Sequence, residues 1–279
     1  MGMAEERLGI VVSAMGGMTD ALINLAVLAE RDDDGYGAEL EAIGERYAAT
    51  AGELLQGDNR VPVLDAWSAD AEDVRNVLKA IALVKSAPQR SRDVVAGYGE
   101  IWSARLLAAY LGQEAPQRGG TWVDAREVVT VHETELGPSV LWDESQARFD
   151  DVVPADFSGI AVITGFIATD QDGLPTTLGR NGSDFSAAIF ASLSNAGALS
   201  IWTDVDGVMS ADPNRVPEAQ VIDQLTYNEA MELAYFGAKV IHPQTLSPVI
   251  GKDIPVWIRN SHNPEHPGSR IAADAALID

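Results

Sequence analysis

Five short runs of apolar and β-branched residues are spread along the chain, and longer segments with helical patterns separate them. The runs occupy residues 8–14, 120–131, 159–169, 198–208 and 254–260. Continuous apolar runs of this length are typical of strands that are buried on both faces, as in parallel sheets. Strands that alternate with helices predict an α/β fold, a three-layer α/β/α sandwich with a mainly parallel central sheet.

The helical segments between the strands have recognisable ends. A glycine turn at 16–17 precedes a helix for which Thr19 or Asp20 is the predicted N-cap. The segment 93–112 predicts a further helix, which Gly112 would close.

Towards the C-terminus, Thr226 is followed three residues later by Glu229, the spacing of a capping box, at the start of a predicted helix over 226–241. The last residues, 271–279, have no obvious partner strand.

Charge and composition exclude several classes of protein. The formal net charge is −23, from 42 acidic and 19 basic residues, and such a surface repels nucleic acids and anionic membranes. The sequence has no cysteine, so it has no disulfide, thiolate nucleophile or cysteine metal site. No apolar run reaches the roughly 18 residues of a membrane span, and the first residues lack the pattern of a secretory signal. A cytoplasmic protein is therefore expected.

The segment 176–193, TTLGRNGSDFSAAIFASL, combines a glycine-rich turn with the start of a helix. Gly179 and Gly182 allow close approach of the backbone, and Ser183 or Asp184 is the predicted helix cap. The free N–H groups of a helix N-terminus, together with the guanidinium of Arg180, suit a carboxylate or phosphate. A capped helix whose arginine pairs with a neighbouring acid explains the segment equally well. Further along, Phe185, Ile189 and Leu193 recur at helical spacing and predict a core face.

The segment 203–217, TDVDGVMSADPNRVP, follows a predicted buried strand and so lies where α/β folds bind ligands. Its residues Asp204, Asp206 and Asp212 could order a ribose or a metal-bound phosphate, or they could simply form turns. A calcium loop is excluded, because Arg215 occupies the position of the required terminal glutamate.

Three further features carry charged or imidazole side chains. Lys239, near the end of an apolar helix, could complement the helix dipole or contact a nucleotide phosphate. Glu100 is interpreted as a helix-start acid with favourable dipole placement. His262 and His266 have metal-ligand spacing, but they lie in a proline-containing loop without a third ligand, which argues against zinc.

Standard catalytic motifs are missing. The sequence contains no G-x-x-x-x-G-K-S/T loop, no complete G-x-G-x-x-G and no G-x-S-x-G elbow. It is thus neither a P-loop protein nor a dinucleotide-binding protein of the usual pattern.

Several blocks taken together resemble the aspartate kinases of the amino-acid kinase family. The blocks are VVSAMGGMTDAL, GYGEIWSARLLAAYL, TLGRNGSDFSAA, IWTDVDGVMSADP and YFGAKVIHPQTLSPV. They occur in the family's order, and the likeness extends from about residue 8 to residue 271. The resemblance implies the amino-acid kinase fold and the transfer of phosphate from MgATP to the β-carboxylate of L-aspartate, a step towards lysine, threonine and methionine.

The resemblance also implies roles for individual residues. Arg180 and Asp184 would serve catalysis, with Arg180 on the α-carboxylate of aspartate. The implied substrate-binding residues are Ser13, Thr19, Glu100, Arg180, Gly182 and Ser183. The implied nucleotide-binding residues are Thr203, Asp204, Met209, Asn214, Arg215 and Lys239, with Lys239 on the phosphates. ATP and Mg²⁺ would be the co-substrate and its metal, with no protein metal site.

We expect the two parts of one catalytic domain to divide this work. Residues 1–158 would bind the amino acid and residues 159–279 the nucleotide. A homo-oligomer is expected, with no nucleic-acid or membrane partner.

The sequence departs from the family pattern in three places. The family's first strand and turn read like K-F-G-G-S/T-S, and none of the four lysines here, Lys79, Lys85, Lys239 and Lys252, stands in that context. Met209 replaces an aromatic residue, and Asn214 replaces an arginine, although Arg215 is adjacent. We therefore expect a fold without the family's first strand, without its C-terminal regulatory domains, and with weak or no kinase activity. The chain could be the kinase part of a bifunctional aspartokinase/homoserine dehydrogenase.

Two other functions remain open. The chain could phosphorylate another carboxylate, such as glutamate, acetylglutamate or carbamate. It could instead be a non-catalytic relative that binds a nucleotide or a partner subunit.

Overall fold

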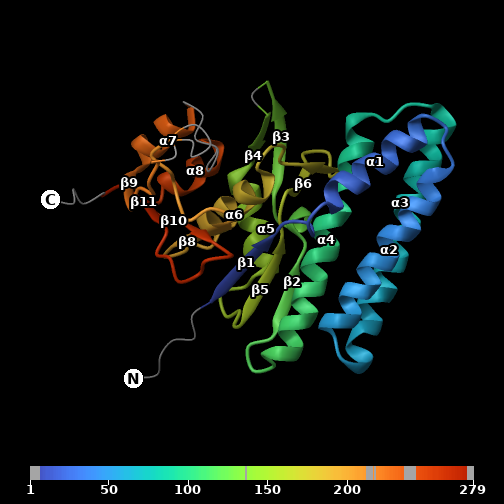
Figure 1. Ribbon diagram of the computed structural model, residues 1–279, viewed down its shortest axis with the longest axis horizontal. Coiled ribbons are helices and arrows are strands. Elements are labelled where there is room, and N and C mark those ends of the chain that lie inside the picture. The colour runs from blue at the N-terminus through green and yellow to red at the C-terminus, as the bar shows by residue number, and fades with distance from the viewer. Residues whose placement is uncertain (1–6, 136, 212–215, 217, 236–242, 275–279) are drawn as a thin grey trace. The chain divides into compact units, whose positions relative to one another are not determined.

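The computed structural model describes residues 7–135, 137–211, 216, 218–235 and 243–274 (Figure 1). The chain divides into two compact units, Met1–Ser183 and Asp184–Asp279. The sequence division at 158/159 falls before strand β5 (Ile160–Thr164), which pairs with strands of the first unit.

The first unit contains a three-stranded parallel sheet with the order β1-β5-β2. β1 spans Leu8–Val12 and β2 spans Gly120–Val123, on either side of the central strand β5. All five residues of β5 are buried. The run of apolar and β-branched residues predicted this, because both faces of a central parallel strand are covered.

Four long helices of the first unit lie side by side, as Figure 1 shows in blue to green. They are α1 (Met18–Glu30), α2 (Gly35–Leu54), α3 (Arg60–Val84) and α4 (Gln89–Glu114), with a short 3-10 turn at Gly57–Asn59 before α3. α4 joins this bundle to the sheet. Its small residues Ala104 and Ala108 pack against Ile160 and Val162 of β5, so the helix backbone approaches the sheet closely.

Aromatic side chains fill the middle of the bundle. The rings of Tyr47 and Trp67 stack with centroids 6.3 Å apart, and Trp67 lies 5.8 Å from the ring of Trp102. Gly44 on α2 faces the Trp67 ring so closely that a Cβ there would lie 2.3 Å from it. The glycine therefore lets α2 and α3 approach around a large side chain.

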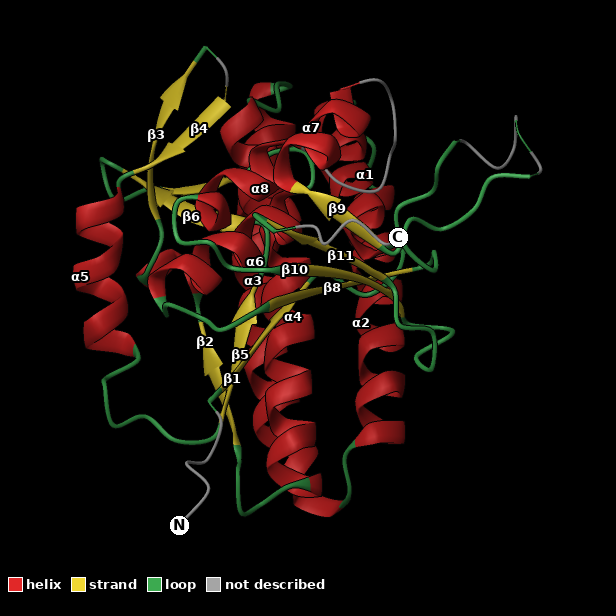
Figure 2. Cartoon of the chain, turned by 90° about the vertical axis from the view of Figure 1, so that its left-hand side faces the viewer, coloured by secondary structure: helices red, strands yellow, loops and turns green. Residues whose placement is uncertain are grey.

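A second sheet of the first unit has the strand order β4-β3-β6-β7, with α5 beside it (Figure 2). Its elements are β3 (Thr130–Thr134), β4 (Gly137–Val140), α5 (Trp142–Val152), β6 (Ile167–Asp170) and β7 (Pro175–Thr177), and a 3-10 turn at Ala125–Glu127 precedes β3. β6 follows β5 after only two residues, Gly165 and Phe166, so one chain passes directly from the first sheet to the second.

The second unit has one four-stranded sheet with the order β8-β10-β11-β9. Its elements are α6 (Gly182–Leu193, which begins at the end of the first unit), β8 (Leu199–Thr203), β9 (Gln224–Thr226), α7 (Tyr227–Tyr235), α8 (Pro243–Ile250), β10 (Val256–Asn260) and β11 (Ser269–Ala272). The core buries Ile201 and Ile258 of the sheet with Ala188 and Leu246 of the helices. Among the described strands, five pairings are parallel and three antiparallel, so the predicted mainly parallel α/β fold is confirmed.

Three helices start or end close to the predicted positions, but the residues at their ends differ from the predicted ones. Gly17, with φ 74°, is the N-cap residue of α1, so the glycine pair starts the helix and neither Thr19 nor Asp20 caps it. α4 continues to Glu114, because Gly112 keeps a helical backbone and has open space around it. α6 starts at Gly182, which places Ser183 and Asp184 inside its first turn and not at the cap.

Other local predictions are confirmed or corrected by backbone pairing. The capping box is present, since Thr226 Oγ1 accepts from the N–H of Glu229 and Glu229 Oε2 accepts from the N–H of Thr226. The tail is partly paired, against expectation, because Ile271 and Ala272 belong to β11 between β10 and β9. Phe185, Ile189 and Leu193 are all buried, as their spacing predicted.

Candidate active site

The chain segments that follow β1 and β5 meet Ser183, the last residue of the first unit, where these two strands end. The N–H of Gly165 donates to the carbonyl of Val12 over 2.8 Å. A Cβ on Gly165 would lie 2.8 Å from that carbonyl oxygen and 2.9 Å from the side chain of Ser183. Only a residue without a side chain leaves room for this approach. Ser183 is thereby brought to the carboxyl end of β1, the edge at which α/β sheets bind ligands.

The loop after β1 also contacts the middle of α4. A Cβ on Gly99 would lie 2.9 Å from Ala14 and within 3.4 Å of Met18. This close packing places Glu100 beneath the loop, and its Oε1 lies 3.4 Å from the amide nitrogen of Ala14. Glu100 is 3% exposed and lies inside a 26-residue helix. Its interpretation as a helix-start acid is therefore wrong, since the helix begins eleven residues earlier, at Gln89.

The carboxylate of Glu100 has an unsatisfied oxygen. Oε2 has no hydrogen-bond partner among the described residues. Burial raises the pKa of Glu100 to about 7, and the hydrogen bonds from its own amide and from the Ala14 amide offset this only in part. A buried carboxyl group with a free oxygen is costly unless a donor or cation reaches it. An ammonium group of a ligand would satisfy it.

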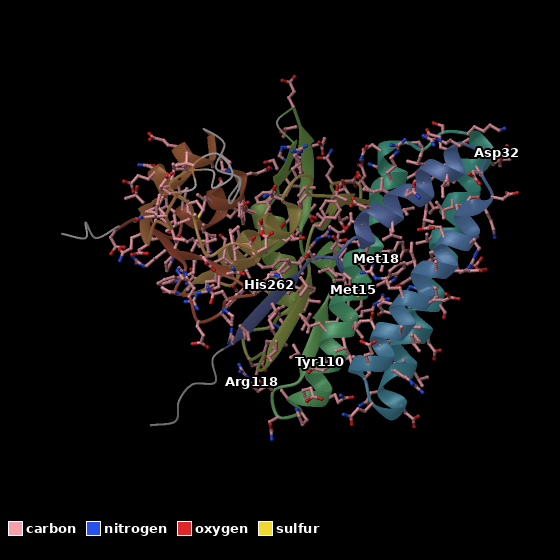
Figure 3. The ribbon with its side chains drawn as sticks, viewed as in Figure 1. Met15, Met18, Asp32, Tyr110, Arg118 and His262 are labelled. Atoms are coloured by element: carbon pink, nitrogen blue, oxygen red, sulfur yellow. The ribbon has the colours of Figure 1, made fainter. Side chains whose placement is uncertain are left out.

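The glycine pair before α1 exposes a helix N-terminus next to this carboxylate (Figure 3, where Met15 and Met18 flank the pair). No side chain caps α1. Arg46 on α2 donates from Nη2 to the carbonyl of Gly16 over 2.6 Å and so holds the turn. Thr19, in the first turn of α1, is half-buried, and its hydroxyl makes no hydrogen bond to another described residue. Its hydroxyl is thus available to a ligand.

The turn before α6 presents Arg180. Gly179 and Asn181 both have positive φ values, 73° and 55°, and the N–H of Gly182 donates to the carbonyl of Gly179 over 3.1 Å. This tight turn leaves Arg180 exposed, without an ion pair or hydrogen bond in the described part of the chain. In a protein with 42 acidic residues, an unpaired arginine beside a helix N-terminus favours an external anion over an internal partner.

The structure brings only some of the predicted substrate residues together. Glu100 and Ser183 each contact the loops at the ends of β1 and β5. Ser13 is exposed in the loop that carries Ala14, and Asp184 follows Ser183 in the first turn of α6. Asp184 has interactions within the chain and is not a free carboxylate.

The predicted nucleotide segment lies at the carboxyl end of β8 in the second unit. Thr203 is the last residue of the strand, and its Oγ1 donates to Asp204 Oδ1 over 3.2 Å. Asp204 is exposed. Met209 is half-buried and forms an isolated antiparallel bridge with Val221. The predicted residues Asn214, Arg215 and Lys239 lie outside the described residues.

Three side chains of the site region were not singled out from the sequence. Arg46, Asn260 and Asn263 each hold a loop of a candidate segment through a hydrogen bond. Asn260 is the last residue of β10 and Asn263 lies three residues beyond it, so both are at the carboxyl end of a strand, as Asp204 and Asp206 are. That position is a signal that could have identified them. Arg46 lies on a helix surface, where a single arginine carries no signal.

The loop with the two histidines has no metal-site geometry. His266 Nδ1 accepts from the N–H of Gly268 over 3.1 Å, and His262 is exposed. Within the described ranges, no three His, Asp or Glu side chains are grouped as ligands of one ion. The described residues also contain no helix that is long and apolar enough to cross a membrane.

Comparison with known proteins gives a consistent result. The profile of the amino acid kinase family matches residues 2–260. The chain is 43% identical over 269 residues to bifunctional aspartokinase/homoserine dehydrogenase 1, chloroplastic, of Arabidopsis thaliana, covering 95% of this chain and 29% of that protein. It is 34% identical over 277 residues to Arabidopsis aspartokinase 2, chloroplastic, covering 96% of this chain and 49% of that protein. The chain thus spans less than a third of the bifunctional relative.

Solved structures agree with the sequence comparison. The crystal structure of E. coli aspartokinase III in complex with aspartate and ADP, in its R-state, superposes with a TM-score of 0.85 at 28% identity. The match covers 96% of this chain and 58% of that one. Clostridium acetobutylicum aspartate kinase matches with a TM-score of 0.73 at 26% identity, over 99% of this chain and 57% of that one. The fold and the sequence agree, and the chain belongs to the amino acid kinase family.

Proposed function

We propose that this chain is the catalytic region of an aspartokinase, which transfers the γ-phosphoryl group of ATP to the β-carboxylate of L-aspartate. The observation that carries the proposal is the buried carboxylate of Glu100, which has one unpaired oxygen at the carboxyl ends of two parallel strands. Family membership supports a phosphoryl transfer, and the complex of E. coli aspartokinase III with aspartate and ADP supports this pair of ligands.

The first unit would hold the amino acid. Glu100 Oε2 would accept from the α-ammonium group, which supplies the missing partner of the buried carboxylate. Arg180 would donate two parallel hydrogen bonds to the α-carboxylate. The hydroxyl of Thr19 and the free N–H groups at the start of α1 would add donors, and Ser13 would line the same loop.

The chemistry would take place at the N-terminus of α6. An oxygen of the β-carboxylate attacks the γ-phosphorus, the bond from that phosphorus to the β,γ-bridging oxygen breaks, and ADP leaves with the bond's electron pair. The N–H groups of Gly182 and Ser183 would donate to the oxygens on which negative charge spreads. Asp184, which interacts with other groups of the chain, would orient these N–H groups.

The nucleotide would bind at the end of β8. Thr203 and Asp204 would contact the nucleoside and Met209 would pack against it, while Asn214, Arg215 and Lys239 would contact the phosphates. Mg²⁺ would neutralise the phosphates. Because Mg²⁺ usually keeps several waters and binds substrate phosphates with one or two carboxylates, the few exposed acids here, such as Asp204, fit an ion that arrives as MgATP.

We further propose the finer features that the sequence indicates. Residues 1–158 would serve aspartate and residues 159–279 ATP, the product would lead to lysine, threonine and methionine, and the protein would be a cytoplasmic homo-oligomer. Activity of this chain alone would be weak, since no lysine in it stands in a K-F-G-G context. Removing an electrostatic catalyst of that kind costs about 10²–10³ in rate.

A coupled assay of ADP release tests the proposal. Aspartate should stimulate ADP release, and glutamate, acetylglutamate and carbamate should not. Fusing a K-F-G-G strand to the N-terminus should raise the rate by about 10² or more. ADP release that depends on another carboxylate would show a different amino-acid kinase. ATP binding without any dependent turnover, also in the fused protein, would show a non-catalytic nucleotide-binding protein.

A further inference from the structure

The loop that follows β10 is fastened to the segment that follows β8. The two strands are paired in parallel up to Thr203 and Asn260, and the loops diverge from there. Ser261 donates to the carbonyl of Thr203 twice, from its backbone N–H over 2.8 Å and from its Oγ over 3.0 Å. The start of the predicted nucleotide segment is therefore held from outside its own strand.

A second attachment lies three residues further along. Oδ1 of Asp206 accepts from Asn260 Nδ2 over 2.8 Å and from Asn263 Nδ2 over 3.1 Å. Asn260 is itself oriented, because its Oδ1 accepts from the N–H of His262 over 2.8 Å. The two amide donors lower the pKa of Asp206, so the acceptor is a carboxylate at neutral pH. Hydrogen bonds to charged acceptors are the stronger ones.

A third attachment closes the loop. The N–H of Val208 donates to Ser269 Oγ over 2.8 Å. Gly207 has φ 156°, and a Cβ there would lie 2.4 Å from that hydroxyl oxygen, so a glycine is needed for the approach. The segment from Thr203 to Val208 is thus fixed at its beginning, middle and end to the stretch from Asn260, the last residue of β10, to Ser269, the first residue of β11.

Asp204 is the exception within this segment. It is exposed, and its only described hydrogen bond is the one from the neighbouring Thr203 hydroxyl. The attachments therefore fix the backbone around Asp204 and leave its carboxylate exposed, with the neighbouring Thr203 hydroxyl as its described donor. Asp206 has the opposite role, because its Oδ1 is occupied by two amides of the chain.

We infer that Asp206, Asn260 and Asn263 form a positioning clamp for the nucleotide-binding segment Thr203–Asp204. The clamp acts on a nucleoside di- or triphosphate through that segment and contributes nothing to the amino-acid site. The inference rests on the proposed function for its ligand class. Asp206, which the sequence left open between ligand and turn former, becomes a positioning residue.

Steady-state kinetics and calorimetric ADP titration of three variants test the clamp. In Asp206→Ala both amides lose their acceptor, and we expect the KM for ATP and the Kd for ADP to rise about tenfold, the effect of one charge-assisted hydrogen bond. The KM for aspartate should stay within about twofold. Asp206→Asn keeps a carbonyl oxygen for both amides, and it should restore most of the affinity for ADP.

Glu265→Ala is the matched control, since Glu265 is an exposed acid in the same loop without a described hydrogen bond. It should leave both KM values and the ADP affinity unchanged. If Asp206→Ala raises the KM for ATP and the KM for aspartate equally, the clamp is overturned. The same increase in Glu265→Ala would also overturn it. Melting temperatures recorded with each variant identify global unfolding, and titration well below the melting midpoint keeps the ADP comparison valid.

The test separates the clamp from the proposed kinase activity. If the chain binds ADP but shows no aspartate-dependent turnover, also when it is fused to a K-F-G-G strand, the kinase proposal fails and the ADP affinities alone decide the clamp. A wild-type chain that binds no ADP overturns both.

Discussion

The amide nitrogen of Ala14 lies 3.4 Å from Oε1 of Glu100, although 86 residues separate them, and Oε2 of the same carboxylate has no partner among the described residues. One oxygen thus fixes the side chain beneath the loop after β1. The other remains for a ligand. This division makes Glu100 the most informative residue for experiment.

Replacing Glu100 should change how stability depends on pH. Burial raises its pKa from 4.5 to about 7, so the folded protein holds a proton that the unfolded chain releases between these values. Stability should therefore fall as pH rises from about 4.5 to about 7 and then level off. Glu100→Gln removes this loss, and relative to the variant the wild type should lose about 3 kcal/mol across the window. Urea unfolding of both proteins at pH 5 and pH 8 measures this difference. If the free energy of unfolding changed equally with pH in the two proteins, the raised pKa would not belong to Glu100.

Aspartate affinity should depend on the same titration. An ammonium group binds the ionised carboxylate, so the KM for aspartate should fall as pH rises through about 7, while the KM for ATP should not follow it. In Glu100→Gln this pH dependence should disappear. Persistence of the pH profile in the variant would assign it to another group.

Arg180→Lys should weaken aspartate binding without destabilising the protein. Lysine keeps the positive charge but loses the two-pronged geometry, and we expect at least a tenfold rise, roughly 1.4 kcal/mol, in the KM for aspartate. Because Arg180 is exposed and unpaired within the described residues, unfolding free energy should change by less than about 0.5 kcal/mol. Arg75→Lys, at a half-buried arginine that pairs with Glu72 on the helix surface, is the control and should change neither quantity.

Gly165→Ala should separate the loops that meet at β1 and β5. The added Cβ would lie 2.8 Å from a backbone oxygen and 2.9 Å from Ser183, and backbone cannot move aside as a flexible side chain can. Overpacking of this kind costs about 1–3 kcal/mol, and the turnover should fall as well because Ser183 is displaced. Gly112→Ala, in open space on α4, should instead stabilise by about 0.5–1 kcal/mol. Thermal melts and ADP-release rates of the two variants distinguish a local steric effect from a general sensitivity to alanine.

Asp70→Ala should test what holds α4 in place. The carboxylate of Asp70 on α3 accepts from Trp102 Nε1 over 3.1 Å and pairs with Arg105, and both partners lie on α4 close to Glu100. Its loss leaves a buried indole N–H and a largely buried guanidinium unpaired, which should cost about 2–3 kcal/mol in urea unfolding. Asp65→Ala, an exposed acid on α3, should cost less than about 0.5 kcal/mol. Equal stabilities of the two variants would show that α4 is held by its apolar contacts alone.

The sequence by itself determined the α/β class, because apolar runs and the helical spacing of Phe185, Ile189 and Leu193 are local patterns set by burial. It did not show that the run 159–169 forms two strands, β5 and β6, of different sheets. It also located the turn around Arg180 and the capping box at Thr226, since glycine and capping chemistry act over a few residues.

Only the tertiary structure decided which of these local features act together. Glu100 looked like a helix-start acid, and its burial depends on Gly99 meeting the loop at Ala14. From the sequence, Asp206 could have bound a ribose or a metal-bound phosphate. In the structure its Oδ1 accepts from Asn260 and Asn263, more than fifty residues away, so it holds parts of the chain together. Desolvation and hydrogen-bond partners arise from packing between distant segments, and single-sequence periodicity carries no information about them.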